Sequence, residues 1–145
     1  MVGLVVATHG SLAASLLETA AAIVGPLERA VAVSVDAHTS VDEARVRLAT
    51  AIHKVGEDGE GVLVLTDMFG GTPANLALTF LDEQIEVVTG VNLPMLMKLA
   101  TTRSQGLPAA AELATAHGQK NITLASDVLR PKVAGGPASG GGGGA

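Results

Sequence analysis

The opening residues carry an apolar run that stops abruptly at a polar turn. Leu4–Ala7 is apolar and contains two adjacent valines, which is typical of a buried strand, and Thr8-His9-Gly10-Ser11 follows at once. A second apolar run, at 61–65, ends in the same way at Thr66-Asp67. Continuous apolar runs are typical of parallel strands that are covered on both faces. We therefore expect a buried parallel sheet with His9 and Asp67 at its carboxyl edge, where ligands bind.

Helical and strand patterns alternate through the rest of the chain. This alternation is typical of an α/β domain in which right-handed crossovers connect parallel strands. We predict an open, mainly parallel four-stranded sheet of order 2-1-3-4, flanked by helices. The predicted strands cover 4–9, 29–36, 61–67 and 85–89, and the predicted helices cover 11–24, 40–55, 72–81, 92–104 and 108–117.

Three of these helices begin with residues that favour helix starts. Ser40-Val41-Asp42-Glu43 has the spacing of a capping box, and Ser11 is the expected N-cap of the first helix. In Gly70-Gly71-Thr72-Pro73 the glycines allow a sharp turn, Thr72 is the expected N-cap, and Pro73 suits the first helical position.

The last patterned segment, Asn121–Val128, follows two successive helices and breaks the alternation. We expect it to form a strand, either at an antiparallel edge of the sheet or donated to a partner subunit. From residue 131 the composition changes to that of a flexible Gly-rich tail. The prediction is therefore one domain at 1–130 and a tail at 131–145. The tail fits a truncated interdomain linker, a natural disordered end or a cloning remnant.

The composition excludes several classes of protein. The 145 residues are 48% apolar with a mean hydropathy of +0.43, which is enough to bury a core. The formal net charge is -5 and Lys and Arg form no run, so nucleic acid is not an expected partner. Without cysteine there are no disulfides and no thiolate metal sites. No apolar segment reaches the roughly 20 residues of a membrane span, and no basic leader precedes the first strand, so we expect a soluble cytoplasmic protein.

His9 and Asp67 are the candidate catalytic residues. If the second strand lies on one side of the first and the third on the other, the two side chains meet where the strand order reverses. A carboxylate at one imidazole nitrogen fixes the tautomer and leaves the other nitrogen with a directed lone pair, which makes histidine a nucleophile. Amides at helix starts and glycine-rich turns bind phosphate. The candidate phosphoryl-binding residues are Gly10, Ser11, Gly70, Gly71 and Thr72.

A histidine at a strand end and a Gly-Gly-Thr-Pro turn are each more often structural than catalytic. The combination of the two is what favours phosphoryl transfer. His38 also follows a strand and is the rival candidate, although no glycine-rich turn accompanies it. His53 and His117 are expected to be structural or merely exposed. Convergence of His9, His38 and Asp67 is conceivable, but no spacing demands a metal. The motifs of phosphate loops, dinucleotide sites and hydrolase elbows are absent, so we expect no cofactor.

Three segments together resemble a known family. They are Thr8-His9-Gly10, Leu65–Asn75 (LTDMFGGTPAN) and Thr89–Met95 (TGVNLPM). In order and spacing they resemble the mannose-type enzyme IIA domain of the bacterial phosphoenolpyruvate-dependent sugar phosphotransferase system. The phosphotransfer subunit of dihydroxyacetone kinase shares the early histidine but fits the second segment less well. The resemblance implies a four-stranded parallel sheet with a fifth, antiparallel strand, Asn121–Val128, exchanged across a homodimer.

The same resemblance implies a phosphocarrier that works through a phosphohistidine. His9 would accept a phosphoryl group from the histidine-containing phosphocarrier protein HPr and pass it to an enzyme IIB domain for sugar uptake, with Asp67 as the supporting aspartate. The IIB domain would connect the chain indirectly to a membrane sugar permease. Many members continue into a IIB domain, whereas this sequence continues into a Gly-rich tail. The alternative is therefore a stand-alone regulatory phosphorelay or a protein-binding module, and a phosphatase-like enzyme is a third possibility.

Overall fold

Four parallel strands form one sheet in the computed structural model, which describes residues 1–130. The central strand β1 (Gly3–His9) pairs with β2 (Ala30–Val35) on one side and with β3 (Val62–Thr66) on the other, and β4 (Ile85–Thr89) pairs with β3. The strand order is β2-β1-β3-β4, so the predicted fold class and the predicted sheet order are both confirmed.

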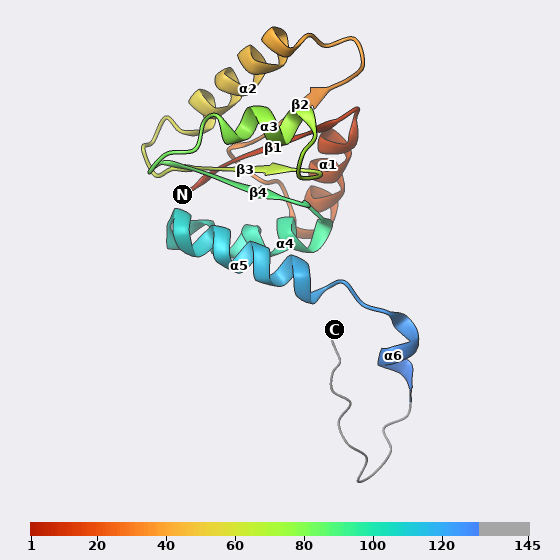
Figure 1. Cartoon of the computed structure of the whole chain (residues 1–145). Coiled ribbons are helices and arrows are strands. Elements are labelled where there is room, and N and C mark those ends of the chain that lie inside the picture. Colours follow the sequence, from red (N-terminus) through yellow and green to blue (C-terminus); the bar gives the residue numbers. More distant parts are fainter. Residues whose placement is uncertain (131–145) are drawn as a thin grey trace.

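Helices cover both faces of this sheet (Figure 1). The helices α1, α4 and α5 pack on one face, and α2 and α3 pack on the other. Each face therefore has its own apolar core. The helices are α1 (Leu12–Val24), α2 (Val41–Val55), α3 (Thr72–Leu78), α4 (Leu93–Thr102), α5 (Leu107–Lys120) and α6 (Ala125–Leu129), with a 3₁₀ turn at Arg103–Gln105 between α4 and α5.

Alternation of side chains along β1 divides the core between the two faces. Leu4 and Val6 face α1 and α4, whereas Val5 and Ala7 face α2. All four side chains are buried, which is why the run is apolar throughout. The amino end of β1 lies so close to α2 that a Cβ atom on Gly3 would lie 2.3 Å from the carbonyl oxygen of Val55. Glycine is thus required for this close approach.

Two predicted helix caps differ from the structure. Ser11 occupies the N-cap position of α1 but makes no capping hydrogen bond, because the buried Thr8 hydroxyl accepts from the Ala13 amide at 2.7 Å instead. Thr72 is already the first residue of α3, and Gly71 occupies its N-cap position. The predicted capping of α2 is confirmed, since the Ser40 side chain accepts from the Glu43 amide. The hydroxyls of Ser11 and Thr72 are therefore not used for capping.

The predicted strand at 121–128 is wrong for the single chain. Residues 122–124 form no regular structure and α6 follows them, leading away from the sheet and the other helices (Figure 1). A strand needs a neighbouring strand for its hydrogen bonds, and without one this segment satisfies part of its backbone as a short helix. Exchange across a dimer needs a second chain and stays a prediction. The predicted tail at 131–145 lies outside the described residues.

None of the helices described within residues 1–130 is both long enough and apolar enough to cross a bilayer.

Candidate functional site

The structure brings His9 and Asp67 together at the carboxyl edge of the sheet. His9 is the last residue of β1, and Asp67 directly follows β3, its parallel neighbour. The register places Ala7 beside Thr66, so that the next residues of both strands leave the sheet at the same level. Because the strand order reverses at β1 and β3, this is the position at which an open α/β sheet binds its ligands.

Asp67 holds His9 through both the ring and the backbone. Nδ1 of the imidazole lies 2.8 Å from Oδ2 of Asp67, and the backbone N–H of His9 donates to the same oxygen at 3.0 Å. The other carboxylate oxygen, Oδ1, accepts from the Met68 amide at 3.0 Å. An ionised carboxylate only accepts hydrogen bonds, so Nδ1 carries the hydrogen and Nε2 carries the lone pair.

The environment of Asp67 favours its ionised form. Burial raises the pKa of the carboxyl group, but the hydrogen bonds from the ring and backbone of His9 outweigh this effect and leave the pKa below its ordinary value. The Asp67 side chain is 14% exposed, whereas that of His9 is 49% exposed. The pair thus consists of an enclosed carboxylate and an imidazole that is open to a reaction partner.

Gly71 leaves space for the edge of the imidazole that faces away from Asp67. A Cβ atom at this position would lie 2.7 Å from Cε1 of His9 and 3.3 Å from Nε2. Real side chains do not approach this closely, so the ring can take its observed position only because residue 71 is glycine. Its φ of -82° would suit any residue, which means that space rather than backbone conformation selects glycine here.

The amides around the imidazole differ in their availability. The Gly10 N–H donates to the carbonyl of Val35 at 3.0 Å, and the predicted role of Gly10 in binding phosphoryl oxygens stays a prediction. Gly10 forms the turn after β1 with a φ of +55°. The other candidate phosphoryl-binding residues keep their N–H groups free of hydrogen bonds within residues 1–130; they are Ser11, Gly70, Gly71 and Thr72.

The remaining histidines lie apart from this pair. His38 lies in the turn after β2, where its backbone N–H donates to Asp36 at 2.9 Å. His53 and His117 lie in the last turns of α2 and α5. Residues 1–130 contain no group of three His, Cys, Asp or Glu side chains that could hold a metal ion. Thr8 is the residue near the site that sequence reasoning missed: it reads as part of a strand, yet its hydroxyl fixes the start of α1.

Comparison with known proteins places this arrangement in a family. A family model named EIIA-man and described as "PTS system fructose IIA component" matches residues 3–116. The chain belongs to the EIIA-man family. The predicted resemblance to the IIA components of the phosphotransferase system is confirmed.

Relatives of this EIIA-man chain include a protein of similar length and longer proteins. The PTS system fructose-specific EIIA component of Bacillus subtilis is 30% identical over 105 residues, which is 71% of each chain. The mannose-specific EIIAB component of Escherichia coli is 32% identical over 108 residues, which is 70% of this chain but only 32% of that protein. The match to the longer relative thus spans about a third of its length.

Solved structures show the same fold. The mannose/sorbose-specific IIA subunit from Enterococcus faecalis superposes with a TM-score of 0.78 at 30% identity, covering 91% of this chain and 98% of that one. A phosphotransferase system component EIIA from Streptococcus agalactiae gives a TM-score of 0.76 at 27% identity, covering 88% and 99%.

Substitution of Gly71 by alanine tests how tightly the imidazole of this EIIA-man domain is seated. We expect the phosphoryl acceptance that the sequence predicts for His9 to slow by about 10- to 100-fold, because the new methyl group displaces the ring from its position against Asp67. Single-turnover labelling measures the rate, and the ¹⁵N shifts of His9 report the hydrogen bond at Nδ1. The melting temperature should change little, since the half-exposed ring can rotate away. An unchanged rate with unchanged ¹⁵N shifts would contradict the steric argument.

Proposed function

We propose that His9 is a phosphohistidine carrier that accepts a phosphoryl group from HPr and passes it to an enzyme IIB acceptor in sugar uptake. The observation that carries this proposal is the 2.8 Å contact between Nδ1 of His9 and Asp67, which leaves Nε2 as the open nucleophile. Family membership supports it, because the matched relatives are components of the phosphotransferase system.

The chemistry of the proposed step needs only one attacking lone pair. Nε2 of His9 attacks phosphorus as the bond between phosphorus and the donor nitrogen of phospho-HPr breaks, and the bonding electrons return to that nitrogen. Positive charge develops on the His9 ring, and the adjacent Asp67 carboxylate stabilises it while keeping the proton on Nδ1. The transfer to the IIB acceptor is the same displacement with His9 as the leaving group. Positioning and charge stabilisation therefore dominate.

Free polar groups near His9 would bind the phosphoryl oxygens. Ser11 and Thr72 each offer an amide and a hydroxyl that capping leaves unused, and Gly70 and Gly71 offer further amides. Gly71 lies beside the Cε1–Nε2 edge of the ring, and this position supports a role for the turn in binding the phosphoryl group. The proposal requires neither a metal nor a nucleotide. It places the chain in the cytoplasm, associated with a membrane permease only through the IIB component.

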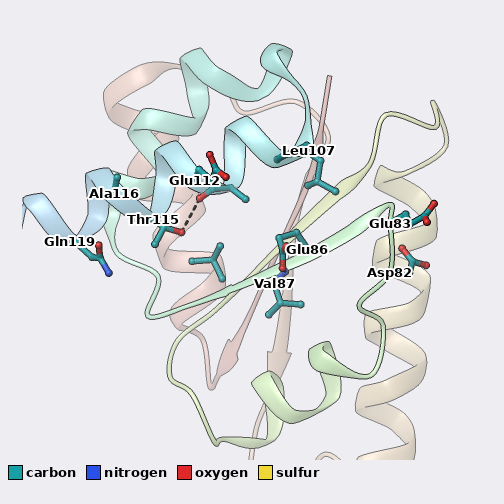
Figure 2. A pocket seen from close by; sticks show the side chains of 12 residues that line it. Asp82, Glu83, Glu86, Val87, Leu107, Glu112, Thr115, Ala116 and Gln119 are labelled. Carbon is teal, nitrogen blue, oxygen red and sulfur yellow. Dashed lines mark hydrogen bonds between the residues drawn. The ribbon is translucent and has the colours of Figure 1, made fainter.

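We also propose that the chain is a homodimer in which residues 121–128 are exchanged. No strand pairs with the outer edge of β4 in the described sheet, where only Ile85 forms an isolated antiparallel bridge with Asp82. A groove of about 500 Å³ lies between β4 and α5 (Figure 2). Val87, Val88, Leu107 and Ala111 contribute apolar surface to this groove. The exchanged segment would bring exposed apolar residues to it, namely Ile122, Leu124 and Val128.

Disruption of those apolar residues should dissociate the dimer. We expect light scattering to give a dimer mass for the wild-type chain and a monomer mass for Ile122→Asp/Leu124→Asp, because a buried aspartate without a partner is strongly unfavourable. Val46→Asp on the exposed face of α2 is the matched control and should remain dimeric. A wild-type monomer at micromolar concentration would contradict the exchange.

A reconstituted phosphorelay tests the function itself. The chain is incubated with phosphoenolpyruvate, enzyme I and HPr, and ³²P on His9 is followed with and without candidate IIB domains. Rapid transfer to a sugar-specific IIB domain supports a role in uptake. Stable labelling that no IIB acceptor discharges would replace uptake with a regulatory role, and the absence of labelling would overturn the phosphocarrier proposal.

A further inference from the structure

Two backbone carbonyls in the turns beside the imidazole of His9 accept hydrogen bonds from side chains of other elements. The Ser34 hydroxyl, in β2, donates to the carbonyl of Gly10, the residue that follows His9. The Asn75 side-chain amide, in α3, donates to the carbonyl of Gly70 at 3.3 Å. Gly10 lies in the turn after β1, and Gly70 lies in the turn after β3. Neither donating side chain takes part in the proposed transfer step.

Each of these carbonyls shares a peptide unit with a backbone N–H that has no hydrogen bond within residues 1–130. The carbonyl of Gly10 and the N–H of Ser11 form one unit, and the carbonyl of Gly70 and the N–H of Gly71 form the other. The peptide bonds of these turns are trans, so the C=O and the N–H of one unit are rigidly joined and point in opposite directions. A hydrogen bond that holds the carbonyl therefore also fixes the direction of the N–H.

Glycine leaves these peptide units mobile unless another group holds them. Gly10 has a φ of +55° and Gly70 has a φ of +89°, and no other element lies within 4 Å of the point where a Cβ atom would be. Because glycine has access to many backbone conformations, rotation of either peptide unit would turn its N–H away at little cost. The side-chain hydrogen bond to each carbonyl opposes this rotation.

The position of Ser34 in β2 allows its hydroxyl to reach Gly10. The register of β1 and β2 places Val35 beside His9, and the carbonyl of Val35 accepts from the Gly10 amide at 3.0 Å. Strand β2 thus holds Gly10 through both its N–H and its carbonyl. Arg47 of α2 donates to the carbonyl of Ser34 at 3.2 Å, so the backbone of Ser34 is held in turn.

Asn75 holds the glycine turn through two different groups. Its side-chain amide donates to the carbonyl of Gly70, and its backbone N–H donates to the carbonyl of Gly71 at 2.9 Å. By the same geometry the first bond fixes the N–H of Gly71, and the second fixes the N–H of Thr72. Only the first bond depends on the side chain, so the Thr72 amide is an internal reference for any substitution of Asn75.

We propose that Ser34 and Asn75 are positioning residues, which aim the amides of Ser11 and Gly71 at the phosphoryl oxygens on His9. The inference rests on the proposed phosphocarrier function, in which free amides around the imidazole bind those oxygens. Gly71 lies beside the Cε1–Nε2 edge of the ring, and Ser11 lies two residues after His9. Negative charge is spread over the phosphoryl oxygens during transfer, and donors that already point at them stabilise it without reorganisation. Neither Ser34 nor Asn75 contacts the phosphoryl group itself.

Ser34→Ala and Asn75→Ala remove the two hydrogen bonds one at a time. His9 is phosphorylated with phosphoramidate, and ¹H–¹⁵N spectra compare the amide shifts before and after labelling. In the wild-type chain we expect the amide protons of Ser11 and Gly71 to move downfield on labelling, because each gains a phosphoryl oxygen as acceptor. Ser34→Ala should abolish this movement for Ser11 alone, and Asn75→Ala should abolish it for Gly71 alone.

Single-turnover labelling by phospho-HPr gives the kinetic effect of the same variants. We expect the saturating rate to fall about tenfold in each alanine variant, with the phospho-HPr concentration for half-maximal rate changed by less than about twofold. Ser34→Thr keeps the hydroxyl and should retain both the wild-type rate and the movement of the Ser11 amide. Thr101→Ala is the matched control, because it removes a hydroxyl-to-carbonyl bond at the end of α4, and it should change none of these readouts.

Wild-type rates and wild-type amide shifts in both alanine variants would overturn the positioning roles. Loss of both amide shifts in either variant, or of the Thr72 amide shift in Asn75→Ala, would also overturn them, because the substitution would then have moved the site as a whole. If phosphoramidate labels the wild-type chain and phospho-HPr does not, the proposed function fails, whereas the amide shifts of the phosphoramidate-labelled chain still decide the inference. If neither donor labels His9, the proposed function and the inference both fail.

Discussion

Substitution of His9 by glutamine is expected to abolish phosphoryl acceptance, with labelling falling at least 1,000-fold to the detection limit (on the order of 4 kcal/mol or more in the barrier). Glutamine retains a polar side chain of similar reach, but its amide nitrogen has no lone pair available to attack phosphorus. The His9 backbone N–H would still donate to Asp67, so the carboxyl edge of the sheet should keep its structure. Acid-labile ³²P incorporation from phospho-HPr measures the effect.

His38→Gln is the matched control for this substitution. His38 also follows a strand at the same edge of the sheet, but no carboxylate contacts its ring among the hydrogen bonds of residues 1–130. It should therefore retain full labelling. Retained labelling of His9→Gln together with loss in His38→Gln would transfer the nucleophile to His38, the candidate that sequence reasoning ranks second.

The position of this site could be predicted because a single topological fact determines it. Leu4–Ala7 and Val62–Leu65 are apolar at every position, which identifies them as strands covered on both faces. Once they are neighbours in a parallel sheet, the residues that follow them must meet at the carboxyl edge. The proximity of His9 and Asp67 follows from this pairing, whereas the hydrogen bond between their side chains also depends on the side-chain conformations.

The local hydrogen bonds of the site could not be predicted in the same way. Thr8 and Ser11 can both cap α1, and the sequence favours Ser11 because it directly precedes the helix. The choice of Thr8 depends on its buried position at the end of β1. Likewise, the pairing of β1 with β2 consumes the Gly10 amide, which no local pattern shows. These details depend on the relative placement of elements that are distant in sequence.

The segment 121–128 shows a different limit. Its β-branched and apolar residues favour a strand, but a strand forms only beside a partner, and the single chain leaves this segment outside the sheet. The sequence alone does not state whether that partner belongs to the same chain. The edge of β4 without a neighbouring strand and the groove beside α5 are what make a second copy the proposed source.

Substitution of Asp67 by asparagine is expected to slow phosphoryl transfer by about 100-fold while leaving the fold intact. Oδ2 accepts two hydrogen bonds from His9 and Oδ1 accepts one from Met68, so the site requires an acceptor on both sides. Asparagine supplies only one. If its NH₂ group faces His9, it donates to Nδ1 and forces the proton onto Nε2, which removes the nucleophile. If the NH₂ group faces Met68, it meets the Met68 N–H, which is also a donor. In this orientation no carboxylate stabilises the positive charge that develops on the His9 ring.

Rates from single-turnover labelling and the tautomer of His9 from ¹⁵N NMR test this prediction together. Asp42→Asn is the matched control, because Asp42 is an exposed carboxylate in the first turn of α2 without a role in the site. Its transfer rate should remain within twofold of wild type. A wild-type transfer rate for Asp67→Asn would remove the carboxylate from the mechanism.

The ionisation of Asp67 gives the same substitution a second, pH-dependent effect on stability. Burial raises the pKa of this carboxyl group, but the hydrogen bonds from His9 lower it by a larger amount. The pKa in the folded state is therefore below the ordinary value, and folding favours the ionised form. The ionised Asp67 carboxylate contributes fully to the free energy of unfolding above about pH 4, the ordinary pKa of an aspartate side chain. This contribution is lost as the pH falls through the lowered pKa of the folded state. The difference in unfolding free energy between wild type and Asp67→Asn should therefore be larger at pH 6 than at pH 3, as urea denaturation measures it. An equal difference at both pH values would contradict this prediction. It would mean that the ionised carboxylate of Asp67 stabilises the fold no more than a neutral side chain of the same shape.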